Sequence, residues 1–310
     1  MSPVVAWFRN DLRLLDNLAL LAAIEVAGGG GGAVWPVFCL DPRLVRPNES
    51  AEPDGAKQAD AHRVRFLLQS LAGLQARLQA LGSDLLVVQA PASQALPAIL
   101  AAAAPGSAAT VVAQDEPAWP EVAVQKRVEE ELARASPAHR LQLVWGSTCF
   151  HRDDLAFAKD LADLPDSRGS FGVLAERAAH VRFPREAPAA GALGAWPALP
   201  HVSEALAGMG FQLGIPSEAH LLGADAAAAG SNPLAVMEFV GGEEAGLARV
   251  EEYVWDNEEN LELYFETRNG FLGRDFSSKF SPWLALGCLS VQILKSTLYI
   301  DFCLLKSLGL

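Results

Sequence analysis

The chain has 310 residues, of which 51% are hydrophobic, and it carries a formal net charge of -13 with a pI near 4.9. A chain of this length and apolar content can bury a substantial core, so we expect a globular protein with room for two domains. Affinity for a nucleic-acid backbone depends on concentrated Lys and Arg, so the acidic balance argues against a nonspecific nucleic-acid binder and leaves only local DNA contacts.

The first half of the chain alternates short apolar runs with helical patterns. The runs are Val4 to Phe8, Ala33 to Leu40, Asp84 to Gln89, Thr110 to Gln114 and Leu141 to Trp145. From about Ala56 to Leu81, apolar residues recur every three or four positions, which predicts a helix lying on a sheet. The predicted fold class is therefore α/β, with an N-terminal Rossmann-like domain built on a five-stranded parallel sheet.

Two glycine-rich or polar loops border the first expected helix. Gly28 to Gly32 lacks the GxGxxG order and follows a helix, so we interpret it as a turn and not as a phosphate loop. The loop from Arg9 to Arg13 is densely polar and lies beyond the carboxyl end of the first strand, where open α/β sheets bind ligands. Structural ion pairing is the alternative for this loop, and Asp16 and Asn17 are candidate helix caps.

The four cysteines are far apart and include no C-x-x-C pair, so neither a disulfide framework nor a zinc site is indicated. This usage predicts a reducing intracellular compartment, and we see no targeting peptide before the first strand. The late apolar segment from Ile293 to Leu310 is interrupted by two lysines and an aspartate, which argues against a membrane span. We expect a soluble protein and leave its organelle and oligomeric state open.

Residues 160–235 are rich in Ala, Gly and Pro, which predicts a long connector with short helices. In so acidic a chain, we expect its Arg177, Arg182 and Arg185 to be solvated or paired and not to bind a polyanion. Its histidines, His180 among them, lack metal-ligand spacing and are expected at the surface.

The stretch from Tyr264 to Ser290 concentrates serine hydroxyls, one lysine and two helix starts. Ser277, Ser278 and Ser281 flank Lys279 and precede a proline, which suits the first position of a helix because its missing N–H needs no partner there. Serine side chains and free N–H groups beside a cation form a seat for a phosphate. We place a cofactor here, and the alternative is a Ser-rich helix cap without a ligand.

Four segments resemble one protein family, in the expected order. They are WFRNDLRLLDNLAL (Trp7 to Leu20), WGSTCFHRDDLAF (Trp145 to Phe157), GGEEAGLARVEEYVW (Gly241 to Trp255) and ETRNGFLGRDFSSKFSPWLALGCLS (Glu266 to Ser290). The first is similar to the opening signature of the photolyase and cryptochrome family, and the last resembles its DASH branch closely. The second and third are similar to the DASH segment that leaves the last strand and to the start of the family's helical flavin domain.

The resemblance implies a site for flavin adenine dinucleotide (FAD). In the family, a tyrosine and a hydroxyl-rich pentad bind FAD, with the pentad near the phosphates. The matching residues here are Tyr264, Ser277, Ser278, Lys279, Phe280 and Ser281. The pentad, Ser277 to Ser281, coincides with the phosphate seat inferred from residue chemistry alone.

The resemblance also implies an antenna folate, 5,10-methenyltetrahydrofolate, which many members hold with a glutamate after the fourth strand. Glu121 looks like the counterpart here, and a carboxylate can accept paired N–H bonds from an aminopterin ring. Glu121 also follows Pro120 in the first turn of an expected helix, where the dipole favours an acid without any ligand. Both interpretations stay open.

The implied activity is that of a deoxyribodipyrimidine photolyase. In the family, an antenna passes excitation to a reduced flavin, which donates an electron to a cyclobutane pyrimidine dimer; the dimer splits and the electron returns. The DASH branch prefers dimers in single-stranded DNA. Repair, blue-light photoreception or both are therefore implied, with damaged single-stranded DNA as the partner.

The expected organisation has four parts. Residues 1–159 form the antenna-binding α/β domain, 160–235 the connector, 236–290 the incomplete start of an all-helical FAD-binding domain, and 291–310 a divergent tail. Because the tail does not resemble the family's next helix, we expect a truncated product. The tail's apolar residues, Ile293, Leu294, Leu298 and Ile300, form either a substitute helix or unselected sequence.

Three classes of function remain at this point. The chain is a DASH-type enzyme or photoreceptor, a non-catalytic pterin-binding or partner-binding α/β fragment, or a nucleotide-binding protein of the electron-transfer flavoprotein or adenine-nucleotide hydrolase kind. The lack of an ordered glycine phosphate loop counts against the third class. Stoichiometric flavin binding separates the first class from the second.

Overall fold

The structure is a computed structural model that describes residues 3–29, 32–45, 60–157, 163–178, 180–194, 200–223, 235–257, 259–270 and 272–297. Its centre is a five-stranded sheet in the order β3-β2-β1-β4-β5, and every pair of neighbouring strands is parallel. The strands are β1 (Val4–Phe8), β2 (Val34–Cys39), β3 (Leu86–Val88), β4 (Thr110–Asp115) and β5 (Arg140–Trp145). The predicted α/β fold class is confirmed.

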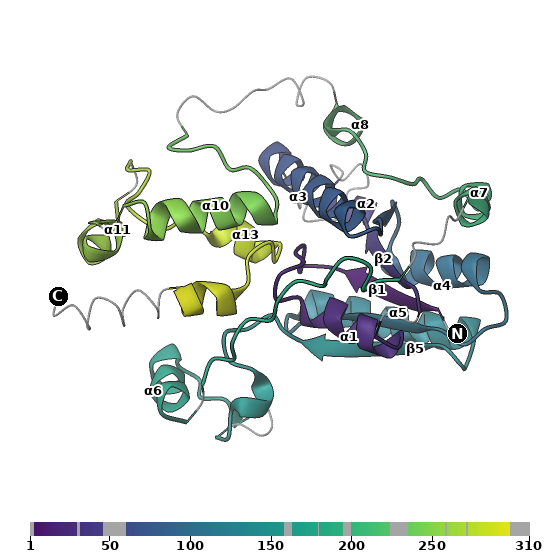
Figure 1. Ribbon diagram of the computed structural model, residues 1–310, viewed down its shortest axis with the longest axis horizontal. Coiled ribbons are helices and arrows are strands. Elements are labelled where there is room, and N and C mark those ends of the chain that lie inside the picture. The colour runs from purple at the N-terminus through teal and green to yellow at the C-terminus, as the bar shows by residue number, and fades with distance from the viewer. Residues whose placement is uncertain are drawn as a thin grey trace, which may run out of the picture.

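Side chains alternate between the two faces along each strand, and both faces carry apolar residues, so helices cover both faces of the sheet. On one face, Val4 and Phe8 join a core with α1 (Leu18–Val26) and α3 (Ala61–Ala80). On the other face, Val5 and Trp7 pack in a second core with three helices. These are α4 (Ala92–Ala103), α5 (Trp119–Ala135) and α7 (Pro200–Gly208). Figure 1 shows these layers around β1 and β2.

The predicted long helix is confirmed as α3, but it begins at Ala61, where Asp60 caps it by accepting a hydrogen bond from Arg63 N. The first residues of the predicted range, 56–59, lie outside the described residues. The expected stripe faces the core, with Leu71, Leu74 and Leu78 fully or almost fully buried. A buried stripe of this kind is what fixes the helix on the sheet.

The two predictions around α1 have different outcomes. Asn17 is the N-cap, and its Oδ1 accepts a hydrogen bond from Leu20 N at 2.9 Å. Asp16 does not cap the helix, so that prediction is wrong: the structure uses its carboxylate elsewhere. After α1 the chain turns through Gly28 and Gly29, both with positive φ, which agrees with the interpretation of the glycine run as a turn as far as it is described; residues 30 and 31 lie outside the described residues.

The connector carries short helices, as expected. They are α6 (Arg168–Ala178), α7, and α8 (Glu218–Leu222), and Figure 1 places them on different sides of the sheet. Arg182 forms two hydrogen bonds to the Asp154 carboxylate, at 2.7 and 2.9 Å, so it is paired as predicted. His180 is exposed. Val202 and Leu206 of α7 are completely buried, so part of this region belongs to the core of the sheet domain.

The last part of the described chain is helical. Its elements are α10 (Glu243–Val254), α11 (Glu259–Glu262), α12 (Tyr264–Thr267), α13 (Ser281–Ala285) and a further helical stretch at residues 291–297. We call residues 241–297 the helical segment. Leu294 packs into the main core, so a packed helix is present at the start of the tail, whereas Leu298 and Ile300 lie outside the described residues. No helix in the described ranges is long and apolar enough to span a bilayer.

Candidate cofactor site

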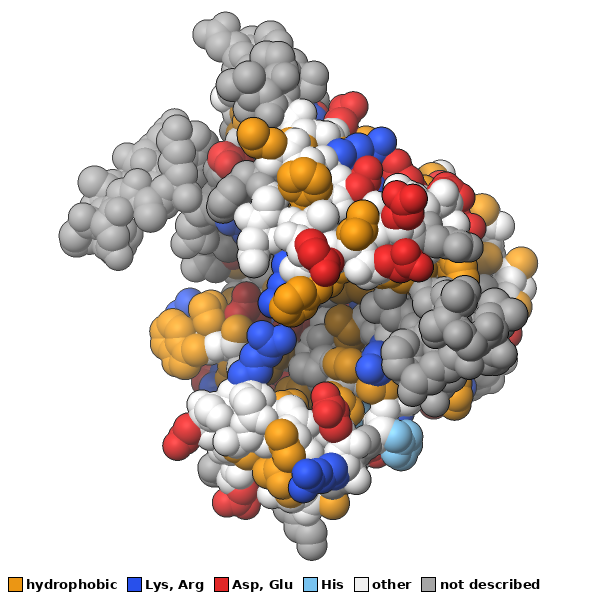
Figure 2. All heavy atoms as spheres, turned by 90° about the vertical axis from the view of Figure 1, so that its left-hand side faces the viewer, with side chains coloured by type: hydrophobic (Ala, Val, Ile, Leu, Met, Phe, Trp, Pro, Cys, Tyr) orange, Lys and Arg blue, Asp and Glu red, His pale blue; other side chains and the backbone are white. Residues whose placement is uncertain are grey.

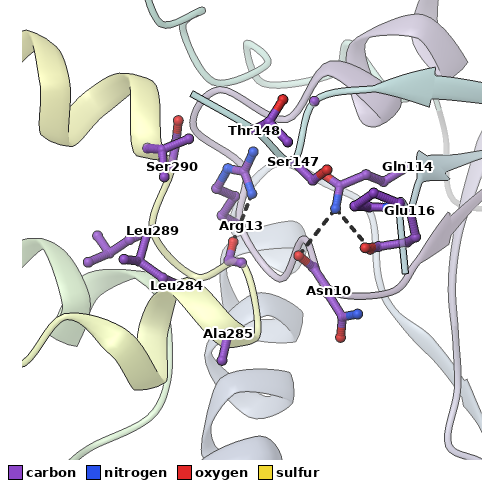
Figure 3. Close-up of a pocket in the computed structure, with 14 residues that line it drawn as sticks. Asn10, Arg13, Gln114, Glu116, Ser147, Thr148, Leu284, Ala285, Leu289 and Ser290 are labelled. Atoms are coloured by element: carbon purple, nitrogen blue, oxygen red, sulfur yellow. Dashed lines mark hydrogen bonds between the residues drawn. The ribbon is translucent and has the colours of Figure 1, made fainter. Parts of the chain in front are cut away.

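The helical segment rests on the loop that follows β1. Leu12 N donates to Leu286 O at 3.1 Å, and the buried Arg13 donates from Nη1 to Gly287 O at 3.0 Å. Gly287 has a φ of +63°, and a Cβ placed on it would lie 1.9 Å from Asn10 O, so only glycine fits this turn. We call this contact between residues 10–16 and 286–290 the seam; Figure 3 shows Arg13 and Asn10 beside α13 and the turn after it.

The carboxylate of Asp16 does not cap α1 because it has other partners. Asp16 has a φ of +55° and is buried, and its carboxylate accepts from Arg185 N at 2.9 Å and from Ser290 Oγ. Asp16 thus connects the β1 loop to the connector and to the helical segment. A left-handed conformation at a non-glycine residue is uncommon, and these bonds hold it in place.

A second buried carboxylate fixes the start of α10. Glu243 is 5% exposed and accepts from Leu14 N at 2.7 Å and from Leu15 N at 2.9 Å, while Arg77 of α3 forms an ion pair with it. A buried charge is tolerated only when it is paired and hydrogen-bonded, and Glu243 meets both conditions. The loop therefore orients both α10 and α13.

The polar loop from Arg9 to Arg13 is thus largely structural. Among the described residues, the guanidinium of Arg13 donates to main-chain carbonyls only, those of Leu15, Asp16 and Gly287. Arg9 donates to Gln125 Oε1 at 2.5 Å and to Glu121 O at 3.0 Å. The loop is held by hydrogen bonds from these two guanidiniums to neutral oxygens, and among the described residues it does not show the ion pairing expected as the structural alternative.

The pentad lies at the start of α13, as its sequence predicts. Ser281 is the first residue of the helix and Pro282 follows in its first turn. Phe280 is buried against Tyr253, with ring centroids 5.8 Å apart at 80°, and Trp283 donates from Nε1 to Val240 O at 3.0 Å. Phe280 and Trp283 therefore anchor the pentad to α10 and to the chain just before it.

The serine hydroxyls of the pentad are not used as caps. The N-cap of α13 is Phe280, without a side-chain hydrogen bond. Within the described part of the chain, the hydroxyls of Ser277, Ser278 and Ser281 have no hydrogen-bond partner. The alternative of a Ser-rich cap without a ligand is therefore not what this structure shows. These hydroxyls remain available as donors.

Lys279 is held in a left-handed conformation, with a φ of +56°. Its Nζ donates to Gly273 O at 2.9 Å, which closes the loop before α13. Partial burial, and secondarily the nearby Arg249, lowers the pKa of the Lys279 ammonium. Lys279 therefore contributes a cation beside the serines while also tying its own loop together.

Tyr264 comes from the neighbouring helix α12 and is 40% exposed. It lies close to Tyr253, whose pKa is raised by burial and, to a smaller extent, by the presence of Tyr264. Tyr253 in turn packs on Phe280 of the pentad. All six residues named for FAD belong to the helical segment.

Arg249 is a functional candidate that sequence reasoning missed. It lies on α10, is 3% exposed, and donates from Nε to Ser278 O at 3.2 Å. The signal was present: Gly246, Val250 and Tyr253 mark the buried face of an amphipathic helix, and an arginine occurs on that face. A charged residue among apolar positions of a helix requires buried partners.

Glu121 lies in the first turn of α5, at the carboxyl edge of the sheet. It lines a pocket of about 200 Å³ together with Trp7, Arg9, Cys39 and Asp41. Its Oε2 is buried and has no hydrogen-bond partner among the described residues. A buried carboxylate oxygen without a donor is costly unless a ligand supplies one.

A further pocket of about 300 Å³ lies at the seam. Figure 3 shows the side-chain amide of Gln114 between the Asn10 carbonyl and Glu116, and Gln114 Nε2 lies 3.0 Å from Glu116 Oε1. Burial raises the pKa of Glu116, which is 7% exposed, and the hydrogen bond from Gln114 opposes this rise. The pocket is lined from both parts of the molecule.

The outer surface of the helical segment is apolar and acidic. Phe265 is 72% exposed and Leu272 is 90% exposed, and Figure 2 shows acidic side chains gathered near apolar ones on the upper part of this face. Among the described residues, no cluster of three or more His, Cys, Asp or Glu side chains could hold a metal ion. The chemistry available at this site is that of hydroxyls, one lysine and buried arginines.

The protein has two parts. One is a parallel sheet covered by helices on both faces, and the other is the helical segment with its pentad, which packs on the loop after β1. Comparison with known proteins gives the family: residues 4–169 match the family model described as DNA photolyase, and the chain belongs to that family. The family resemblance stated from the sequence is confirmed, including its DASH branch.

The relatives are DASH cryptochromes. The chain is 36% identical over 293 residues to the chloroplastic/mitochondrial cryptochrome DASH of Arabidopsis thaliana, covering 94% of this chain and 46% of that one. It is also 36% identical over 291 residues to cryptochrome DASH of Gloeobacter violaceus, covering 94% and 52%. The solved Synechocystis cryptochrome aligns with a TM-score of 0.78 at 31% identity, covering 99% of this chain and 60% of that one. The chain spans about half the length of the curated relatives it matches.

Proposed function

We propose that this chain carries the phosphate-binding side of a DASH-type flavin site and acts in light-dependent electron transfer with FAD. The observation that supports this most is the pentad: three serine hydroxyls, without hydrogen-bond partners among the described residues, flank Lys279 at the positions that match the family's FAD-binding pentad. Tyr264, on the adjacent α12, completes the set.

The residues present fit the diphosphate of FAD. Ser277, Ser278 and Ser281 are intermediate or exposed, and hydroxyl donors with a nearby ammonium are suited to phosphate oxygens. Buried Phe280 and Trp283 keep this stretch fixed on α10, so little order has to be gained on binding. When bound, FAD supplies the light absorption and the electron, and the chain's own residues hold and orient it.

The activity proposed is the repair of cyclobutane pyrimidine dimers, preferably in single-stranded DNA, or blue-light photoreception, or both. The support is the family assignment together with relatives named cryptochrome DASH. A partner DNA has to be bound locally because the chain as a whole is acidic, with a net charge of -13.

We also propose that Glu121 holds an antenna pterin such as 5,10-methenyltetrahydrofolate. The support is its buried Oε2, which lacks a donor among the described residues, in a pocket beside Trp7. The N–H groups of an aminopterin ring would supply that donor. A pterin-binding chain without flavin remains the competing function, and it lacks the support of the unpartnered serine hydroxyls.

The flavin site is tested by titrating the chain with FAD and following flavin fluorescence. The double variant Ser278→Ala, Lys279→Ala should bind FAD about tenfold more weakly or worse, because it loses charge-assisted hydrogen bonds. The matched control is Ser203→Ala with Lys126→Ala, on α7 and α5. Equal affinity in the pentad variant and the wild type would refute the assignment of the pentad.

A further inference from the structure

Arg249 holds several parts of the helical segment together. Its guanidinium donates from Nε to Ser278 O at 3.2 Å and from Nη1 to Glu252 at 3.1 Å, and the same Nη1 lies 3.0 Å from Asp275 Oδ1. It also lies over the Tyr253 ring, 5.1 Å from the ring centroid. One side chain therefore contacts the pentad, the loop before it and the helix beneath it.

These contacts fix a short and strained loop. Asp275 and Ser278 are both held by Arg249, and between Gly273 and Lys279 the loop is closed by the Lys279 ammonium. Lys279 has a φ of +56°, which an L residue adopts only when its surroundings impose it. Arg249, buried on α10, holds this loop in its conformation through its contacts with Asp275 and Ser278.

Burying the charged side chain of Arg249 costs folding free energy that its contacts offset only in part. Its side chain is 2% exposed, and its Nη2 is buried without a hydrogen-bond partner among the described residues. Its two carboxylate partners are each 37% exposed, which weakens the pairing, and the Asp275 Oδ1 that faces Nη1 is buried without a hydrogen-bond partner among the described residues. An apolar residue would pack at this position at lower cost, which points to a role beyond the packing of α10.

We infer that Arg249 is a positioning residue for the flavin site: it holds the main chain at Ser278 so that the pentad hydroxyls present a preformed seat for the diphosphate. This inference rests on the proposed function for the identity of the ligand. Its structural half, the fixing of residues 272–281, does not depend on any ligand.

Lysine cannot replace Arg249 in this role. A guanidinium is planar and directs several N–H groups at once, whereas an ammonium is a point charge. Arg249 uses Nε for the pentad carbonyl and Nη1 for the carboxylates, so its two functions lie on different atoms of one fork. A lysine at position 249 would keep the positive charge for the ion pairs but would lose the hydrogen bond to Ser278 O.

The test combines hydrogen exchange with FAD titration on the full chain. In the ligand-free protein, peptides within residues 272–281 should exchange several-fold faster in Arg249→Lys and Arg249→Gln than in the wild type. Peptides of β4 should be unchanged, which shows that the fold is intact. FAD affinity should fall about tenfold or more in both variants, because a hydrogen bond from a charged group is lost.

Arg274→Gln is the matched control. Arg274 belongs to the same loop and pairs with the same Glu252, but its side chain is 50% exposed. A surface pair contributes little, so exchange and FAD affinity should stay close to the wild type. If Arg249→Gln fails to fold, Asp275→Asn loosens the same contact from the surface side and should also speed exchange in residues 272–281.

The outcomes separate the inference from the proposed function. Wild-type exchange and wild-type FAD affinity in Arg249→Lys would overturn the inference, because the fork would then be unnecessary. A wild-type chain that binds no FAD would remove the proposed function, while faster exchange in the Arg249 variants would still establish the structural half.

Discussion

The guanidinium of Arg13 lies 3.0 Å from the carbonyl oxygen of Gly287, a residue 274 positions later in the chain. This bond joins the first loop of the sheet domain to the turn after α13. Leu12 and Asp16 bind the same region through Leu286 and Ser290. The orientation of the pentad is therefore set from two sides, by the β1 loop at the end of α13 and by Arg249 at its start.

Gly287→Ala should destabilise the protein strongly. The new Cβ would lie 1.9 Å from Asn10 O at a residue with a φ of +63°, so the seam has to open. We expect a loss of more than about 3 kcal/mol in the free energy of unfolding, measured by urea denaturation. Gly214→Ala is the control, because Gly214 also has a positive φ but nothing within 4 Å of the added Cβ. The control should lose only about 1 kcal/mol; equal losses would mean that the seam is not closely packed.

Glu243→Gln should lower the free energy of unfolding by about 3 kcal/mol. It leaves Arg77 without its buried counter-charge, and the new NH2 group would face the N–H of Leu14 or Leu15, which donates to Glu243 in the wild type. The neighbouring Glu244 is exposed in the same first turn of α10, so Glu244→Gln serves as the control and should change stability by less than about 1 kcal/mol. Urea denaturation at neutral pH measures both. A Glu243→Gln variant as stable as the control would contradict the anchoring role of this carboxylate.

Glu116 predicts a specific dependence of stability on pH. Burial raises its pKa in the folded state above the ordinary value of 4.5, so between these two values the folded chain holds a proton that the unfolded chain has released. Stability contributed by this group therefore falls as pH rises through that interval. Glu116→Gln keeps an acceptor for Gln114 and removes the titration, so its stability relative to the wild type should increase from pH 4 to pH 7. A constant difference across this range would show that Glu116 is not perturbed.

Glu121→Gln should weaken the binding of 5,10-methenyltetrahydrofolate about tenfold, because a charged acceptor for paired N–H groups is lost. Fluorescence titration of the folate measures this, with Glu129→Gln on the exposed face of the same α5 as the control. If Glu121 serves only the helix dipole, the variant lowers stability by less than about 1 kcal/mol and leaves folate binding unchanged.

Sequence reasoning succeeded where the information is local. The strands were predictable as short apolar runs, since the central ones are buried on both faces, and α3 because its apolar residues recur every three or four positions and form its buried face. The pentad was predictable because its serines, lysine and proline are adjacent. The burial of Arg249 left only a weak local signal, a charge on an apolar helix face.

The seam could not be predicted in the same way. The bond between Arg13 and Gly287 and the acceptance of two loop N–H groups by Glu243 join residues more than 200 positions apart. No spacing rule links such positions. Asp16 shows the result: its residue type suits a helix cap, but the tertiary structure uses its carboxylate for Arg185 and Ser290.

The central claim is that the pentad and its supports form a flavin site in this chain. It is tested most directly by loading the purified chain with FAD, removing unbound flavin by gel filtration and recording the visible spectrum with the protein concentration. We predict flavin absorption bands equimolar with the chain, lost in the Ser278→Ala, Lys279→Ala variant. A colourless wild-type chain that is monomeric and folded would contradict the claim.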